Sequence, residues 1–156
     1  MRDKKYNIVI VGYGGMGSYH CHLIEPIKQL SVCGVYDIAD YRRELAETNG
    51  YKTYHCFDAV LADETVDVIL IATPNDVHKD IAINSLQAGK HVICEKPVTI
   101  NSRDYLEKLE VAKRENLVFT VHQNRRWDED FLIVKDYDRK KEIGGSFSCR
   151  ISGSWS

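Results

Sequence analysis

Short apolar runs rich in Val and Ile alternate with amphipathic stretches along the first 122 residues. A continuous apolar run is typical of a strand buried on both faces of a parallel sheet, whereas apolar residues three and four positions apart indicate a helix. Alternating strands and helices predict an α/β fold, a doubly wound parallel sheet of order 3-2-1-4-5-6 with right-handed crossovers. We expect six strands, at Ile8–Val11, Val32–Tyr36, Tyr51–Cys56, Val66–Ala72, His91–Glu95 and Leu117–Val121.

The helices between these strands have recognisable ends and apolar faces. Pro26 lacks a backbone donor, so we expect the first helix to kink or stop near Glu25. Asn75 and Asn101 are good N-caps for the helices that follow them, and Asp40 is placed to cap a helix at Tyr41–Thr48. The expected inward-facing residues are Met16, His20, Leu23, Ile24 and Ile27 in the first helix, and Tyr105, Leu106, Leu109 and Ala112 in the helix after Asn101.

A glycine motif, G-x-G-x-x-G, lies between the first strand and the first helix. Three glycines alone often mean only a tight turn, but this context is that of the dinucleotide-binding turn of a Rossmann-type sheet. There Gly12 makes the turn, Gly14 lets a pyrophosphate approach the backbone, and Gly17 lets the helix pack closely on the strand. The free N–H groups at the helix N-terminus would bind the phosphates.

Asp37 follows the second strand, twenty positions after Gly17. A carboxylate at this point can accept hydrogen bonds from the adenosine ribose and would repel a 2′-phosphate, which favours NAD over NADP. The alternative is a structural role as a helix cap. Arg42 and Arg43 leave NADP open, since a nearby arginine can accommodate the 2′-phosphate.

Two polar segments follow later strands, namely Thr73-Pro74-Asn75 and Glu95-Lys96-Pro97. In an open parallel sheet, ligands bind at the carboxyl ends of the strands. Both segments are therefore expected at the same edge as the glycine turn. The isomer of the Lys96–Pro97 bond stays open at this point, since X–Pro bonds occur in both forms.

The composition is that of an ordinary soluble globular protein, with 44% hydrophobic and 28% charged residues. A net charge of −2 gives no electrostatic reason to expect nucleic acid or an anionic membrane as a partner, and no stretch is long and apolar enough to span a bilayer. The five cysteines are scattered without C-x-x-C spacing, so neither a disulfide framework nor a metal site is expected. Such thiols fit a reducing cytoplasm.

Beyond residue 122 the pattern changes. Asp128–Lys141 predicts a helix, and from Phe147 the odd positions are mostly apolar while the even positions are polar. This period of two predicts a strand with one buried face, as in an antiparallel sheet. A lone strand buries little surface, so we expect the chain to be a fragment that stops where a second domain begins; the alternative is a strand that pairs with another subunit.

The motifs in this order resemble the glucose–fructose oxidoreductase, inositol dehydrogenase and MocA (Gfo/Idh/MocA) family of NAD(P)-dependent oxidoreductases. The matching pieces are GYGGMG at 12–17, Asp37, ATPNDVH at 72–78, EKP at 95–97 and HQNRRWDEDF at 122–131. The resemblance implies an NAD(P)-binding Rossmann domain at 1–122, a connecting segment and helix at 123–145, and the start of a truncated α+β C-terminal domain at 146–156.

Carried over residue by residue, the resemblance assigns the pyrophosphate to the turn Gly14, Gly15, Met16 and Gly17, and the ribose to Asp37. It implies that Thr73, Pro74, Asn75 and His78 line the nicotinamide side, with Glu95 and Lys96 beside the nicotinamide ribose. It also implies that Asn124, Arg125 and Arg126 face the cleft; the alternative for the arginines is a salt bridge that ties the two domains together. Lys96 is the expected catalytic residue, because a cation there stabilises the alkoxide that develops as hydride leaves. His122 is equally compatible with a purely structural role.

The implied reaction transfers hydride between NAD, or NADP, and a secondary alcohol of a sugar, cyclitol or related small molecule. The family's second catalytic group, a histidine helped by an aspartate, lies in the C-terminal domain, so this chain alone is expected to bind cofactor at best. The family also implies a homo-oligomer assembled through that domain. One alternative is a non-catalytic nucleotide sensor, for which EKP would be unnecessary; another, a methyltransferase, would explain neither EKP nor TPN.

Overall fold

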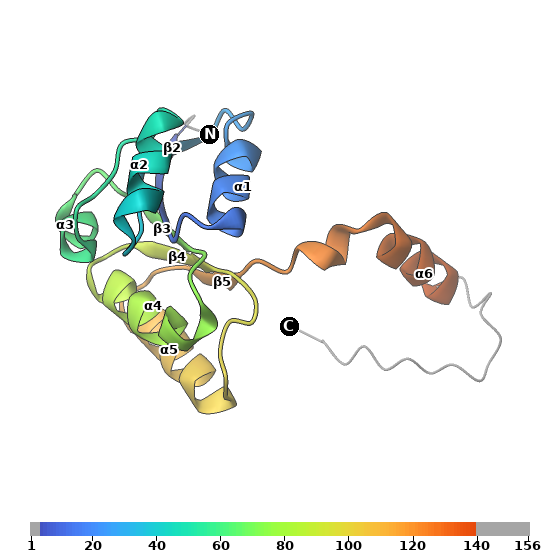
Figure 1. The fold of residues 1–156 in the computed structure, drawn as a ribbon. Helices are drawn as coiled ribbons and strands as arrows, with labels where there is room; N and C mark the ends of the chain where they lie inside the picture. The colour runs from blue at the N-terminus through green and yellow to red at the C-terminus, as the bar shows by residue number, and fades with distance from the viewer. Residues whose placement is uncertain (1–3, 140–156) are drawn as a thin grey trace. The chain divides into compact units, whose positions relative to one another are not determined.

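The computed structural model describes residues 4–139, and the chain divides into two compact units, Met1–His122 and Gln123–Ser156 (Figure 1). The first unit is a five-stranded sheet with helices on both faces. The strand order is β2-β1-β3-β4-β5, and every pair is parallel. The strands are β1 (Tyr6–Val11), β2 (Leu30–Tyr36), β3 (Val68–Ile71), β4 (His91–Cys94) and β5 (Phe119–Val121). The α/β Rossmann class predicted from the sequence is confirmed.

Successive residues of the central strands supply two separate apolar cores, because side chains alternate between the faces of a sheet. Ile8 and Ile10 belong to the core beneath α1 (Gly15–Ile24) and α2 (Asp40–Thr48), together with Cys21. Val9 and Val11 belong to the core on the opposite face. That face is covered by α3 (Phe57–Ala62), α4 (His78–Gln87) and α5 (Ser102–Arg114).

The predicted third strand, Tyr51–Cys56, is wrong as a strand. Only an isolated bridge joins Thr53 to Val35, supported by hydrogen bonds from the Val35 N–H to Lys52 O and from the Tyr54 N–H to Val35 O. The Tyr54 ring lies over Gly34, where an added Cβ would come within 2.4 Å of the ring. Tyr54 is thus anchored in the core, and the chain turns into α3 before a longer ladder can form.

Helix ends follow the predictions in most places. α1 ends at Ile24, before Pro26, and Gly50 and Gly89 adopt positive φ after α2 and α4. The Asn101 side chain accepts the Asp104 N–H at 2.9 Å, so that cap is confirmed. Two caps are wrong: Asp40 lies inside α2, and Asn75 opens a 3₁₀ turn, η1 (Asn75–Val77), that precedes α4. A residue already in helical conformation cannot act as the extended N-cap.

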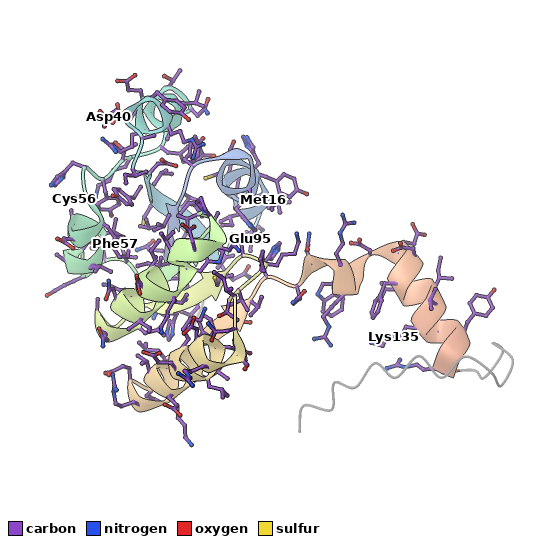
Figure 2. The ribbon with its side chains drawn as sticks, turned by 60° about the horizontal axis from the view of Figure 1, so that its bottom comes forward. Met16, Asp40, Cys56, Phe57, Glu95 and Lys135 are labelled. Carbon is purple, nitrogen blue, oxygen red and sulfur yellow. The ribbon has the colours of Figure 1, made fainter. Side chains whose placement is uncertain are left out.

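Two helix faces were predicted only in part: His20, Ile24 and Ala112 are buried as expected, but other members differ. In α1 the buried residues are Gly17, His20, Cys21 and Ile24, whereas Met16, Leu23 and nearby Ile27 are substantially exposed. Gly17 and Cys21 are small, so this face comes closer to the sheet than a Met or Leu face could. In α5, Leu106 is 58% exposed while Lys108 is completely buried. Figure 2 shows the side chains, with Met16 on α1 and Asp40 on the outward side of α2.

The second unit contains η2 (Asn124–Trp127) and α6 (Glu129–Arg139) among the described residues, where a helix was predicted. Arg125 forms an ion pair with Asp128 at 2.7 Å. The predicted strand from Phe147 lies outside the described residues. Within residues 4–139, none of the helices combines the length and the apolar character that crossing a membrane requires.

Asp63, which follows α3, joins several elements of the first unit. Its Oδ1 accepts the Thr65 N–H and hydroxyl, and its Oδ2 accepts the Tyr54 hydroxyl at 2.7 Å. Its backbone carbonyl accepts the Lys90 Nζ–H at 2.8 Å. The Thr65 and Tyr54 hydroxyls, followed by the Thr65 N–H, hold the pKa of the Asp63 carboxyl well below its usual range.

We predict that Asp63→Asn lowers the free energy of unfolding by about 1–3 kcal/mol at pH 7, because an amide cannot accept all of these hydrogen bonds. A carboxyl with a depressed folded-state pKa stabilises the fold above its unfolded pKa, and that contribution is lost as pH falls. Urea unfolding between pH 7 and pH 3 should therefore show a smaller loss of stability for Asp63→Asn than for the unaltered chain. Glu64→Gln, at an exposed neighbour, is the control. Equal pH dependence in all three proteins would contradict the prediction.

Candidate nucleotide-binding site

The glycine turn after β1 is built on two contacts that exclude any side chain. Gly12 has φ +97°, and a Cβ there would lie 2.7 Å from the Ala72 carbonyl oxygen. A Cβ on Gly17 would lie 1.8 Å from the Gly12 carbonyl oxygen, which is far inside van der Waals contact. α1 is therefore pressed against the end of β1, and β1 against the end of β3, as the motif predicted.

The start of α1 is open. α1 begins at Gly15, its N-cap Gly14 has no side-chain cap, and the first turn carries no acidic residue. A Cβ on Gly14 would meet nothing nearer than the Arg42 guanidinium at 3.8 Å, and one on Gly15 would meet nothing within 4 Å. Uncapped N–H groups with the positive end of the helix dipole form a site that suits an anion.

Asp37 is buried just beyond β2, beside the glycine turn. Its Oδ2 accepts the Tyr13 N–H at 2.7 Å, and its Oδ1 accepts the Ala39 N–H at 2.9 Å. Arg42 lies 3.4 Å from Oδ2, and hydrogen bonds to Tyr41 and Asp37 raise the pKa of its guanidinium. The carboxylate thus fixes the backbone of the glycine turn, a structural role that the helix-cap alternative did not describe.

His78, the first residue of α4, connects the two polar segments predicted at the sheet edge. Its buried ring lies between two carbonyl oxygens, with Nε2 2.8 Å from Thr73 O and Nδ1 3.1 Å from Pro97 O. His78 therefore supports the loops after β3 and β4 from within, while Pro74 and Asn75 are exposed. The Lys96–Pro97 peptide bond is cis.

The segment after β4 is also held from α5. Lys108 is completely buried, and its Nζ donates to the Val98 carbonyl oxygen at 2.5 Å and lies 5.6 Å from the Phe119 ring centroid. Burial lowers the pKa of Lys108, whereas burial raises the pKa of the neighbouring Cys94 thiol to about 12. Lys96 itself is exposed at the carboxyl edge. Its side chain is free to meet a ligand.

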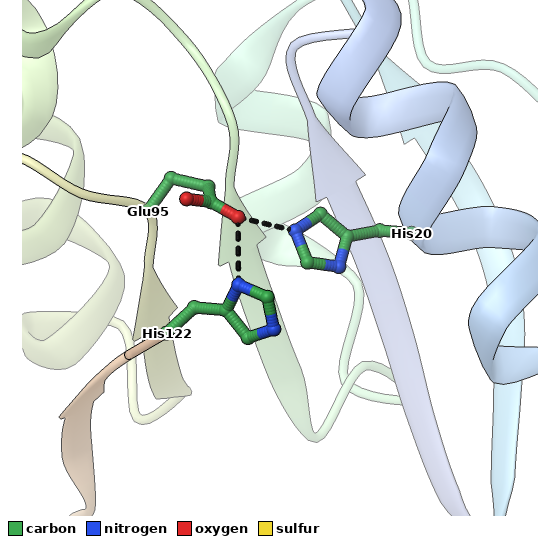
Figure 3. A group of neighbouring side chains, drawn as sticks. All are labelled: His20, Glu95 and His122. Carbon is green, nitrogen blue, oxygen red and sulfur yellow. Dashed lines mark hydrogen bonds and ion pairs between the residues drawn. The ribbon is translucent and has the colours of Figure 1, made fainter. Parts of the chain in front are cut away.

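Glu95 lies at the centre of a buried cluster with His20 and His122 (Figure 3). Glu95 Oε1 is 2.7 Å from His20 Nε2 and 2.8 Å from His122 Nδ1, and Oε2 accepts the Lys96 N–H at 3.0 Å. Burial raises the pKa of the Glu95 carboxyl, but these hydrogen bonds and the two histidines outweigh it, so the net pKa is lowered.

The three atoms of this cluster that could ligate a metal ion, one from each side chain, lie within 4.8 Å of one another. The cluster can therefore be compared with a metal site. Tetrahedral zinc with ligands at its usual distances separates the donor atoms by about 3.3 Å. The two contacts to Glu95 Oε1 are shorter, at 2.7 and 2.8 Å, and are those of hydrogen bonds. The arrangement as it stands is a hydrogen-bonded cluster rather than a metal cage.

Sequence reasoning missed part of this arrangement. His20 was expected to face the sheet, but neither its pairing with Glu95 nor the burial of Lys108 was foreseen. The available signal for His20 was its position one helical turn after Gly17, the residue closest to the sheet. Lys108 gave none, since lysine is almost never fully buried.

The comparisons with known proteins agree with this geometry. Residues 6–123 match the model of the Gfo/Idh/MocA family, described as an oxidoreductase family with an NAD-binding Rossmann fold. The chain belongs to this family. The strands, turn and helix described above form the NAD-binding Rossmann fold of that description.

Similar proteins span a range of identities. A crystal structure of an NAD-binding protein from Listeria innocua is 60% identical with a TM-score of 0.88, over 90% of this chain and 42% of that one. Myo-inositol 2-dehydrogenase of Thermotoga maritima is 29% identical over 93% of this chain and 44% of its own length. The NADP-dependent scyllo-inositol 2-dehydrogenase IolW of Bacillus subtilis is 27% identical over 81% of this chain and 35% of its own length. This chain thus spans less than half the length of each.

Three observations fit a dinucleotide at this edge. The N-terminus of α1 is uncapped, a Cβ on Gly14 would meet only the Arg42 guanidinium within 4 Å and one on Gly15 would meet nothing, and the buried Thr73 hydroxyl has no hydrogen-bond partner among the described residues. An unpaired buried hydroxyl costs free energy unless something completes its bonding. Asn124 Oδ1 is likewise buried without a partner, and Arg125 is paired with Asp128. Whether Asn124 and Arg125 contact cofactor stays a prediction.

The contact between α1 and β1 predicts different outcomes for two glycines of the same turn. Gly17→Ala should lower the free energy of unfolding by about 3 kcal/mol, because the new methyl group overlaps the Gly12 carbonyl and backbone must move. Gly15→Ala should cost nothing measurable, because its methyl group meets open space. Urea unfolding of both variants tests this difference. Equal stabilities would show that the close approach is not needed.

Proposed function

We propose that the whole protein transfers hydride between NAD(P) and a secondary alcohol of a sugar, cyclitol or related small molecule. The observation that carries the proposal is the exposed Lys96 at the carboxyl end of β4, in the chain segment that follows the buried Glu95 cluster. Support comes from relatives named as inositol dehydrogenases in Thermotoga maritima and Bacillus subtilis.

The residues at this edge divide the work of binding. The N–H groups at Gly14, Gly15, Met16 and Gly17 would hold the pyrophosphate, Asp37 the adenosine ribose, and Thr73 would use its unpaired hydroxyl toward the nicotinamide side. Pro74, Asn75 and His78 would shape that side, and Glu95 and Lys96 would flank the nicotinamide ribose. The cofactor, when bound, supplies the hydride acceptor or donor.

Lys96 would act on the substrate oxygen. As an alcohol loses hydride, its oxygen also gives up a proton, which the second catalytic group proposed for the C-terminal domain would accept, and alkoxide character develops on the oxygen. A protonated Lys96 Nζ donating a hydrogen bond to that oxygen stabilises the developing charge, and does so more strongly once the site excludes water. Hydrogen bonds involving His78, Glu95 and Lys108 hold the backbone at Pro97, Lys96 and Val98, from which the Lys96 side chain would extend to the substrate.

The remaining parts of the proposal concern the whole protein. Residues 1–122 would be the nucleotide-binding domain, 123–145 a connection, and 146–156 the start of the domain that supplies substrate contacts, a second catalytic group and the homo-oligomer interface. This chain alone would then be inactive. The thiols of Cys21, Cys33, Cys56 and Cys94 are free, which suits a reducing cytoplasm.

The first test removes the cation. In the full-length gene product, Lys96→Ala should lower kcat with a panel of polyols and inositols by about 10²-fold or more, because the alkoxide loses its partner. The Kd for NADH, measured by fluorescence, should change by less than about threefold, since α1 and Asp37 would carry most of the binding. Lys113→Ala, on the far end of α5, is the control. An unchanged kcat would remove Lys96 from the mechanism, and NADH binding without turnover of any alcohol would favour the sensor.

The second test concerns cofactor preference. Isothermal titration should show NADH bound more tightly than NADPH, because Asp37 repels a 2′-phosphate. Asp37→Asn removes the negative charge and should make the affinities for NADH and NADPH more alike. Arg42→Ala should lower the affinity for NADPH more than the affinity for NADH. Equal or reversed affinities in the unaltered protein would contradict the role of Asp37.

A further inference from the structure

Three side chains from separate elements of the first unit meet at one carboxylate oxygen (Figure 3). His20 comes from the middle of α1, Glu95 follows β4 and His122 follows β5, so the two contacts span 75 and 27 positions of sequence. His20 is 3% exposed and Glu95 is 5% exposed. Buried polar groups are costly unless their hydrogen bonds are made, so this cluster requires its bonds to form together.

The charge on Glu95 determines which nitrogen of each histidine ring carries a proton. Its net pKa is lowered, so the carboxyl is ionised at neutral pH and can only accept hydrogen bonds. Each imidazole nitrogen that faces Oε1 must therefore carry a proton, Nε2 in His20 and Nδ1 in His122. With two donors on one oxygen, the carboxylate has a single orientation.

The second oxygen of the Glu95 carboxylate links its orientation to the backbone. Oε2 accepts the backbone N–H of Lys96 at 3.0 Å. The peptide unit just before Glu95 is held by two backbone bonds: the Glu95 N–H donates to Ile71 O, and the Cys94 carbonyl oxygen accepts the His122 N–H, both at 2.9 Å. The direction in which the chain leaves β4 at Lys96 thus depends on where the two rings hold Glu95.

We propose that His20 and His122 are positioning residues, which hold the Glu95 carboxylate so that it fixes the Lys96 backbone and hence the placement of the Lys96 side chain. The proposal rests on the proposed function only in that Lys96 is the group whose placement affects turnover. Neither histidine contacts the substrate in this scheme. Both act through Glu95, by donating N–H groups rather than by changing charge.

Pairs of variants distinguish the effect of the N–H donor from the effect of losing the imidazole ring. His122→Asn retains an N–H donor near the place of Nδ1, whereas His122→Leu removes it; His20→Gln and His20→Leu form the same pair for Nε2. His22→Leu, on the same helix but exposed, is the control. In the full-length gene product, hydrogen exchange at the Lys96 amide and the steady-state kinetics of polyol oxidation by NAD are measured together.

We expect each Leu variant to accelerate exchange at the Lys96 amide by about tenfold or more, because its acceptor is no longer held. kcat should fall by about tenfold, while KM for NAD changes by less than about threefold, since a misplaced Lys96 affects the chemical step more than binding. His122→Asn and His20→Gln should restore most of both values. His22→Leu should resemble the unaltered protein.

Three results would overturn the proposal: unchanged Lys96 exchange in the Leu variants, no rescue by the donor variants, or an equal acceleration at amides throughout the sheet. If His20→Leu does not fold, the pair at the partly exposed His122 decides. If the protein oxidises no alcohol at all, the proposed function fails. The exchange measurements still decide whether the histidines hold Glu95.

Discussion

The contact between Gly17 and the Gly12 carbonyl is the constraint on which the first unit depends. With no side chain on Gly17, α1 packs directly on the end of β1, and Gly12 in turn packs on Ala72 at the end of β3. The close approach brings His20, one turn further along α1, within 2.7 Å of Glu95 at the end of β4. A bulkier residue at position 17 would move α1 away from the Gly12 carbonyl and, with it, His20 away from Glu95.

Buried polar groups, rather than apolar packing, hold the loops at the carboxyl edge. His78 and Lys108 reach the segment after β4 from α4 and α5 on one face of the sheet, and His20 reaches Glu95 from α1 on the other. Each unmade bond in such a place costs about 1–3 kcal/mol. Side chains from both faces of the sheet thus contact the segment around Lys96, directly at Pro97 O and Val98 O and through the Glu95 carboxylate at the Lys96 N–H.

Patterns along the chain predicted the sheet well, because a strand buried on both faces leaves a continuous apolar run and glycines mark the turns after β1, α2 and α4. Helix faces were less predictable. Periodicity selects large apolar residues, but the face of α1 that touches the sheet is chosen by the small Gly17 and Cys21. Tyr51–Cys56 has the composition of a strand, yet Tyr54 and Gly34 fit together in a way that ends pairing after one bridge.

The candidate site also contains residues that could be predicted from the sequence and residues that could not. The turn, Asp37 and Lys96 could be found from motifs, because each is a short stretch with its own spacing. The Glu95 cluster could not, since its members are 75 and 27 positions apart and meet only through the fold. Lys108 is the extreme case: its burial depends on one carbonyl oxygen, at Val98, which no pattern of side chains reveals.

The shortened pairing at Thr53 also affects how the sheet ends. An edge strand with a long row of free N–H and C=O groups is a template for another chain, and short edges reduce that risk. In the first unit β5 at one edge has three residues, whereas β2 at the other edge has seven and is joined on its outer side by a single bridge at Val35. Among the described residues, the β2 edge is therefore the longer row of unpaired backbone groups, and it is the edge to which a strand of another chain could add.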